Sequence, residues 1–467
     1  MIHASVTKCA LLLTIFCLLS AEGGSGDLPE PPKTQADISD FIQGSENLII
    51  NSQNAARYRS FIVPELFGTV RAGNMVFNAV GKLKYKMQPV PSPSASATPA
   101  IKPAELLLSV QNALSSQKIL EYDLNIISLK ENKLVRELNA TFSRIYPKAL
   151  SDSDKTGQVF KENLRITKPQ PIEGFSWLTF RFPGVEEDLV WAYSPSIKQT
   201  RQITGSNRSD ELLVTGVTLD DIFTWSGKPE LVDAGDVVSG TYLVPFPDDN
   251  VSVGLVKPPC LEVKQDQHEE GVHGTSARWN FASRRYPEAA PWIPTNAIFI
   301  PRQLLRLELE SRDPYSLYGR QILYVDAQTD LPIYKFVFDR AGHPWKTVFS
   351  AYGVTQGEDK KALISYYAFT VVDDTRTGES FIVDFISSAS CSAMTERTEG
   401  TPFDPRKLGD ATTVAIIPLP VASEKMVNTE VRDPAVRDTA VRDTAPSDRV
   451  VESARQTAPD VVPDIDD

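Results

Sequence analysis

The sequence is poor in side chains that bind transition metals and poor in positive charge. Its 467 residues include four histidines and four cysteines, which leaves few ligands for a transition-metal site. Acidic residues number 60 and basic residues 48, so the formal net charge is -12. A protein that wraps nucleic acid needs a basic surface against the phosphates. We therefore expect no nucleic-acid partner, no metal and no cofactor.

Catalytic motifs are also missing. The sequence contains no G-x-S-x-G elbow, no phosphate-binding Walker loop and no dinucleotide fingerprint. His268 and His273 flank two glutamates, but a spacing of five places the imidazoles about 140° apart around a helix. A zinc-protease helix needs a spacing of four, so we interpret this stretch as a polar loop.

Two pairs of carboxylates remain as candidates for acid–base chemistry. Asp220 and Asp221 are adjacent and do not face each other on a helix, whereas Asp221 suits a capping box with Thr218. Glu308 and Glu310 lie two apart on one strand face, which Arg306 shares, and this is typical of a solvated face. We therefore expect that the protein is not an enzyme, with a hydrolase as the weaker hypothesis.

The N-terminus has the pattern of a secretory signal peptide. Lys8 precedes an apolar run over residues 9–19, which is too short to span a bilayer, and cleavage near Ala21 or Gly23 is expected. Cleavage would remove two cysteines and leave Cys260 and Cys391. In an oxidising compartment these two form a disulfide candidate, with two buried thiols as the alternative.

The chain then divides into segments of different composition. We expect a flexible leader over 22–35 and a helix within 36–72 that restarts at Pro64. Residues 74–87 alternate as a strand does. The range 88–104 is rich in Pro, Ser and Ala and predicts a flexible excursion.

Short apolar alternations separated by turns dominate from residue 105 to 388, and this spacing favours antiparallel sheet. Examples of the predicted strands are 121–128, 174–183, 187–193, 229–246, 303–310, 320–326, 332–340, 344–353, 363–373 and 379–386. We expect one β domain over 36–390 and a C-terminal extension over 391–422. No aromatic residue follows Phe403, and three VRD-P/T-A repeats lie in 423–467, which we expect to be a disordered acidic tail.

Aromatic residues concentrate on particular strand faces. Tyr334, Phe336 and Phe338 fall on one face of a strand, and Lys335 and Asp339 fall on the other. The aromatic face must be covered, either as ordinary core or as the lining of an apolar cavity. The pattern alone leaves both interpretations open.

Several of these motifs resemble a known family. The matching stretches are 189–203, 209–228 and 318–346, with a similar opening at 58–75. They resemble a periplasmic family of Gram-negative bacteria whose members are described as outer-membrane lipoprotein-sorting proteins and whose domain has no assigned function. Its fold is similar to that of the lipoprotein-localisation carriers LolA and LolB. The matched residues are Trp191, Tyr193, Pro195, Arg201, Asp221, Phe223, Trp225, Arg320, Tyr324, Asp326, Tyr334 and Trp345.

The resemblance implies a mainly β fold: a large, curved antiparallel half-barrel with a few plugging helices, expected from 36–72 and 218–226 on its concave side. It implies non-catalytic binding or transfer of a lipid, a lipoprotein acyl chain or another apolar molecule in the periplasm, as part of outer-membrane biogenesis. The apolar cavity candidates are Trp191, Tyr193, Phe223, Trp225, Tyr324, Tyr334, Phe336, Phe338 and Trp345. The alternative is an accessory subunit without a ligand cavity that docks on an envelope transporter or another outer-membrane partner.

Overall fold

The computed structural model describes most of the predicted β region. The described residues are 47–50, 62–69, 75–78 and 101–410, with gaps at 132, 151–155, 214, 248–250, 258–259, 266–296, 357–362 and 391–402. All of them belong to the compact unit formed by residues 1–415. The predicted signal peptide, the leader, the histidine-containing stretch at 268–273, Cys391 and the repeat tail lie outside the described residues.

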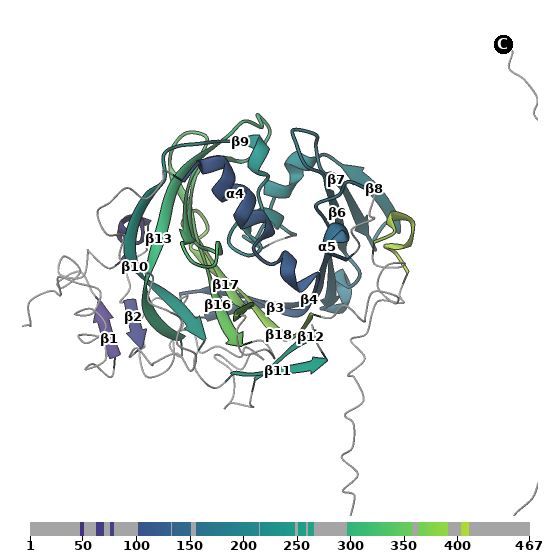
Figure 1. Ribbon diagram of the computed structural model, residues 1–467. Coiled ribbons are helices and arrows are strands. Elements are labelled where there is room, and N and C mark those ends of the chain that lie inside the picture. The colour runs from purple at the N-terminus through teal and green to yellow at the C-terminus, as the bar shows by residue number, and fades with distance from the viewer. Residues whose placement is uncertain are drawn as a thin grey trace, which may run out of the picture. The chain divides into compact units, whose positions relative to one another are not determined.

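One antiparallel ladder forms the body of this unit (Figure 1). Each strand pairs with the next in the order β8, β7, β6, β5, β4, β3, β18, β17, β16, β15, β14, β13 and β10. Their bounds are Gln199–Ile203, Leu189–Ser194, Ser176–Arg181, Phe160–Lys168, Lys133–Ile145, Ile119–Lys130, Glu379–Ser390, Leu363–Asp374, Pro344–Gln356, Pro332–Asp339, Tyr318–Asp326, Ala297–Ser311 and Val238–Pro247. Within the described residues no pairing joins β8 to β10, so the sheet stays open. The predicted mainly β half-barrel is confirmed.

Shorter strands extend this ladder at its margins. β9 (Val232–Ala234) pairs with the end of β13, and β11 (Val251–Lys257) pairs with β12 (Cys260–Gln265), which joins the end of β18. β1 (Asn47–Ile50) pairs with β2 (Met75–Asn78) in a segment where we expected a helix. The helix prediction is therefore wrong for 47–50.

Helices are few among the described residues. α3 (Pro64–Thr69) begins at the predicted proline, which suits the first helical position because that backbone nitrogen needs no acceptor. α4 (Pro103–Asn112) also begins at a proline and buries Leu106, Leu107 and Val110. Its first residues fall inside the predicted flexible excursion, so the structure differs there. The remaining helices are α5 (Pro147–Leu150) and short 3₁₀ turns: η1 (Ser115–Gln117), η2 (Gln170–Ile172), η3 (Gly205–Ser209), η4 (Leu219–Asp221), η5 (Pro229–Leu231) and η8 (Pro405–Lys407).

The two faces of the sheet have different neighbours, and β15 distinguishes them. On its Tyr334 face, the Tyr334 hydroxyl donates to the carbonyl of Leu243 in β10, and Phe336 contacts Tyr324 edge-on. On its Lys335 face, the ammonium donates to the carboxylate of Asp221. The predicted alternation is therefore correct, but Lys335 is fully buried rather than solvated.

The expected helical segments do not share one face. Glu65 of α3 accepts hydrogen bonds from Arg306 and Tyr324, which lie on the Tyr334 face. The 218–226 segment instead contacts the Lys335 face through Asp221. The expectation that both pack on the same concave side is wrong, because the sheet is covered on both faces. No helix among the described residues has the length and apolar character needed to cross a membrane.

Candidate functional site

Residues 205–231, which we call the plug, occupy the Lys335 face of the half-barrel. The plug contains η3, η4 and η5 joined by irregular loops and lies within the curve of the sheet (Figure 1). The hydroxyl of Thr224 donates to Ser350 of β16 at 2.6 Å, and Tyr352 of β16 donates to the carbonyl of Phe223 at 3.0 Å. One short segment therefore packs against the Lys335 face of the sheet.

Phe223 is the apolar tip of the plug. Its ring contacts Phe142 of β4 with the centroids 5.5 Å apart and Tyr367 of β17 at 5.0 Å, edge-on in both cases. Phe223 and Thr224 both have positive φ, 56° and 66°, a conformation that non-glycine residues rarely adopt. Surrounding contacts must hold such a turn in place, and strained backbone of this kind clusters at functional sites.

The space left around Phe223 is small. The apolar hollow between Phe223, Tyr122 and Tyr367 has a volume of ≈ 20 Å³. About one water molecule fits such a volume, whereas ligand pockets typically measure 300–1,000 Å³. The side chain of Phe223 therefore fills most of this space.

A buried ionic cluster ties the base of the plug to the sheet. Asp221 caps η4 by accepting a hydrogen bond from the backbone nitrogen of Thr218, which confirms the predicted capping box. The same carboxylate accepts hydrogen bonds from Lys335 at 2.6 Å and from the hydroxyl of Tyr318 at 2.8 Å. Burial alone would raise the pKa of Asp221, but Lys335 and Lys346 outweigh burial and lower it. Asp221 therefore stays ionised as an anchor and is no candidate acid.

A second buried cluster fastens the opposite part of the plug. Arg208 of η3 donates to Glu162 of β5 at 2.6 Å and to Asp220 at 3.0 Å. Arg144 of β4 binds the other oxygen of Glu162, also at 2.6 Å. Burial alone would raise the pKa of Glu162, but the two guanidinium groups lower it to about 2. Ion pairs of this kind are costly to break, because removing one partner strands a buried charge.

A third ion pair closes the plug beside β6. Arg181 of β6 donates to Asp188 at 2.8 Å and to the carbonyl of Gly227 at 2.7 Å. Lys228 lies 3.4 Å from the same aspartate. Both ends of the 205–228 stretch are therefore fixed by buried charge, and its apolar tip lies between them.

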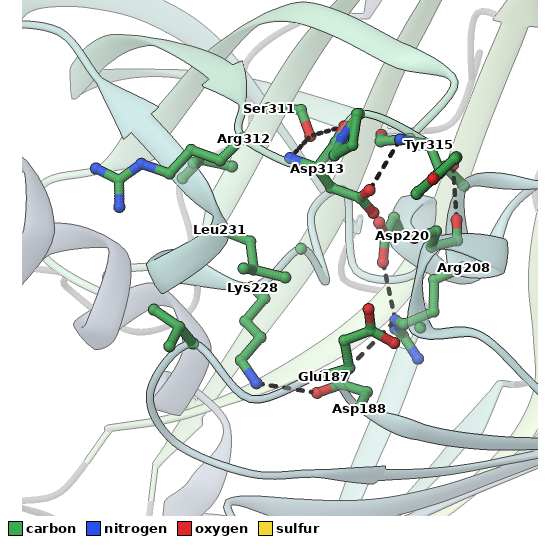
Figure 2. Close-up of a pocket in the computed structure, with 18 of the residues that line it drawn as sticks. Glu187, Asp188, Arg208, Asp220, Lys228, Leu231, Ser311, Arg312, Asp313 and Tyr315 are labelled. Carbon is green, nitrogen blue, oxygen red and sulfur yellow. Dashed lines mark hydrogen bonds and ion pairs between the residues drawn. The ribbon is translucent and has the colours of Figure 1, made fainter.

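A polar cleft opens at the end of the plug (Figure 2). It has a volume of ≈ 280 Å³ and is lined by the plug, by the β6–β7 connection at 185–188 and by residues 311–316, which join β13 to β14. The cleft and a smaller interior hollow share Arg181, Trp225 and Gly227 as wall residues. The 223–227 stretch therefore lies between the cleft and the apolar hollow around Phe223.

The structure divides the nine predicted cavity residues among four apolar clusters. Phe223, Tyr324, Tyr334 and Phe336 belong to the main core, and Phe338 packs against it. Trp225 packs with α4, Trp345 packs with Tyr318, and Trp191 and Tyr193 pack against Phe403 and Leu408. Phe223 and Trp225 both belong to the plug, but the nine residues do not surround one hollow. That these residues bind a ligand remains a prediction.

The disulfide candidate stays equally untested. Cys260 lies in β12, but its side chain and the whole of Cys391 lie outside the described residues. The carboxylate pair in β13 has a clear environment. Glu308 accepts hydrogen bonds from Arg306 and Arg320, which lower its pKa, while Glu310 is exposed. Glu308 therefore serves an ion pair in this arrangement.

The buried charges are the feature that the sequence pattern missed. Glu162, Arg181 and Arg208 lie in segments with ordinary polar composition, where charged residues are usually solvated. A lysine inside the aromatic run at 333–338 was the one available signal, because an alternating strand buried on both faces must bury that lysine as well.

Comparison with known proteins adds fold-level neighbours. No family model matches the sequence, and no curated protein matches it. An outer membrane lipoprotein-sorting protein domain from Vibrio parahaemolyticus is similar at 14% identity, with a TM-score of 0.40 over 61% of this chain and 90% of that chain. A DUF1329 family protein from Desulfovibrio piger has 14% identity and a TM-score of 0.38 over 61% and 89% of the two chains. A LolA superfamily protein from Nitrosomonas europaea has 12% identity and a TM-score of 0.34 over 62% and 93%.

These descriptions name the kind of protein that the sequence motifs resemble. Because the TM-scores lie below 0.5, the proposals that follow rest on contacts within this chain.

Proposed function

We propose that the protein is a non-catalytic, exported binding protein that takes up a lipid, a lipoprotein acyl chain or another apolar envelope molecule on the Lys335 face of its half-barrel. The observation that carries the proposal is the position of the Phe223 side chain. It is an aromatic side chain held at the tip of an irregular plug, in an apolar hollow enclosed by the sheet. Uptake would move Phe223 out and place an acyl segment against Tyr122, Phe142 and Tyr367.

The energetic balance of such an exchange is favourable for a long chain. Exposing a buried Phe side chain costs about 1.5–3 kcal/mol, and each buried methylene contributes about 0.8 kcal/mol. Roughly four methylenes therefore offset the displacement of Phe223. A chain of more than ten methylenes leaves a surplus to cover the cost of ordering it.

The charged anchors favour binding without chemistry. Glu162 and Asp221 both have lowered pKa values and are saturated by basic partners, so neither is poised to exchange protons near neutral pH. The anchors instead give the plug two fixed ends and one movable tip. A lipid or lipoprotein donor and an outer-membrane acceptor in the periplasm are the partners that this role would require.

Native mass spectrometry of the mature protein, purified without detergent from its own envelope fraction, tests the proposal. We expect an adduct of lipid mass that is lost on denaturation. Phe223→Ala should raise the bound fraction, because it empties the hollow. Phe336→Ala is the matched control, since it removes an equally buried phenylalanine from the opposite face. A clean protein mass for all three proteins after incubation with envelope lipids would contradict the proposal.

The small hollow is the one observation that favours the alternative function. An interior with ≈ 20 Å³ of free space is also what an accessory docking subunit of an envelope transporter would have. Affinity capture from envelope extracts with and without residues 423–467 tests a docking role for the tail. Loss of a captured transporter on deletion, together with a clean protein mass, would favour the docking subunit.

A further inference from the structure

We propose that the polar cleft binds a ligand that carries a primary ammonium group. The proposal concerns the cleft alone and does not require an acyl chain to enter the half-barrel. Three features of the cleft support the inference. They are the hydrogen-bonding groups at its wall, the charge of its unpaired side chains and the aromatic residue at its rim.

The four basic side chains of the cleft all have partners within the protein. Lys228 donates to the carbonyl of Glu186 and lies 3.4 Å from Asp188, and Arg312 donates to Asp233 and to the carbonyl of Glu230. Arg208 donates to Glu162, Thr179 and Asp220 and to two backbone carbonyls. Arg181 donates to Asp188 and to the carbonyl of Gly227. Arg208 and Arg181 are buried, and all four basic groups already pair with carboxylates of the protein, so the cleft is not built to hold a phosphate or a carboxylate through them.

The acidic side chains, in contrast, have acceptors to spare. Glu187 is exposed in the cleft and has no ion pair or hydrogen bond with another described residue. Asp313 accepts one hydrogen bond, from the backbone nitrogen of Tyr315 to Oδ1, which leaves Oδ2 open. Asp220 is bound through Oδ1 by Arg208, and Figure 2 shows all three carboxylates at the cleft. Two of the three have no cationic partner among the described residues, so the free groups of the cleft are net negative.

Gln321 gives an independent sign of a ligand. Its side chain lines the cleft from β14 and is 6% exposed. Its carboxamide makes no hydrogen bond to another residue in the described part of the chain. The amide atoms are accessible from the cleft rather than enclosed in the protein, so a molecule in the cleft can hydrogen-bond with them. A ligand with both donor and acceptor capacity would satisfy it.

The rim adds an aromatic surface suited to a cation. Tyr315 is 79% exposed and Val185 is 72% exposed, and both line the cleft. An ammonium group over a tyrosine ring gains about 0.5–1 kcal/mol at an exposed site. The loop that carries Tyr315 is held in place, because Arg340 donates to the backbone carbonyls of Ser316 and Asp313. The rim therefore needs little rearrangement to receive a ligand.

Calorimetric titration of the full-length mature protein with O-phosphoethanolamine tests the proposal, with the N-acetylated compound as the matched probe without an ammonium charge. We expect binding of the first probe and at least tenfold weaker binding of the second. Glu187→Gln should weaken binding about five- to tenfold, and because Glu187 is exposed, folding should not suffer. Gln321→Leu should also weaken binding. Glu310→Gln, an exposed carboxylate outside the cleft lining, should leave binding unchanged.

Equal binding of the two probes, or equal binding by wild type and Glu187→Gln, would overturn the proposal, as would no binding at about 10 mM. A co-sedimentation assay with lipid vesicles then identifies the source of the ammonium group. Co-sedimentation with phosphatidylethanolamine vesicles, but not with phosphatidylglycerol vesicles, and its loss in Glu187→Gln would assign a lipid headgroup. Probe binding without co-sedimentation would support the ammonium site and assign a soluble amine. The outcome of the Phe223 experiment does not affect either result.

Discussion

Replacing Asp221 by Asn removes the negative charge that two buried lysines share and keeps the shape of the side chain. Lys335, Lys346 and Asp221 all have fully buried side chains, with Nζ–O distances of 2.6 Å for Lys335 and 3.7 Å for Lys346. Breaking a buried ion pair on one side typically costs 3–5 kcal/mol. Asn still offers an oxygen to the backbone nitrogen of Thr218, so the loss of the cap, worth about 1 kcal/mol, is not part of this effect. We expect the free energy of unfolding to fall by about 3–5 kcal/mol at pH 7.

The same reasoning predicts how the penalty depends on pH. Burial lowers the pKa of Lys346, and Asp221 and Glu211 partly offset this. Without Asp221, Lys346 can escape by losing its proton, at a cost of about 1.4 kcal/mol for each pH unit below its unfolded pKa of 10.5. Deprotonation of Lys346 therefore limits the destabilisation to about 5 kcal/mol at pH 7 and to about 2 kcal/mol at pH 9. The penalty should therefore shrink as the pH rises.

Urea unfolding followed by circular dichroism at pH 7 and pH 9 measures both effects. Glu308→Gln is the control, because its partly exposed ion pairs contribute less than about 1 kcal/mol. A penalty for Asp221→Asn below 1 kcal/mol, or one equal at the two pH values, would refute the view that buried charge anchors the plug.

Three further predictions concern two buried carboxylates and one glycine. Because the folded-state pKa of Glu162 is about 2 against an ordinary 4.5, wild type should lose roughly 3 kcal/mol as the pH falls from about 5 to 2, and Glu162→Gln should flatten this loss in acid unfolding curves. Glu121 is 2% exposed with neither oxygen hydrogen-bonded, and burial raises its pKa to about 7. Stability should therefore fall from pH 5 to pH 8, and Glu121→Gln should be more stable than wild type at pH 8 only. Gly319→Ala should lower the melting temperature, because the added Cβ would lie 2.5 Å from the carbonyl oxygen of Asp339. Gly342→Ser is the control: its side chain would lie in open space, so it should cost only the strain of the positive φ at that position.

The functional proposals concern two sides of the plug. The tip at Phe223 concerns the interior, and the cleft at Glu187 and Gln321 concerns the solvent side. Trp225 and Gly227 line the cleft and border the interior. If both proposals hold, the ligand is an amphiphile with an ammonium group at one end, and the 223–227 stretch is what such a ligand must displace.

Strand patterning predicted antiparallel sheet, and the family resemblance implied the half-barrel. Alternation in 332–340 and 344–353 identified β15 and β16, because side chains on a strand point to opposite faces with period two. The capping box at Thr218 and Asp221 and the proline start of α3 were also readable, since both depend on contacts within a few residues. β4, β5, β8, β11 and β12 lie outside the example strands named from the sequence, and the helix α4 was missed. The signal in α4 was present as Pro103 followed by Leu106, Leu107 and Val110.

Only the tertiary structure decided what each face of the sheet contacts. From the sequence alone, Lys335 could have faced water. In the structure it is buried, because Asp221 supplies its counter-charge from more than a hundred residues away. The aromatic run could have lined a cavity, and Tyr334 instead packs against β10, while Phe223 fills the other face. Periodicity reports which side chains share a face, because it depends on local backbone geometry. What covers that face depends on long-range pairing and packing, which leave no periodic trace in the sequence.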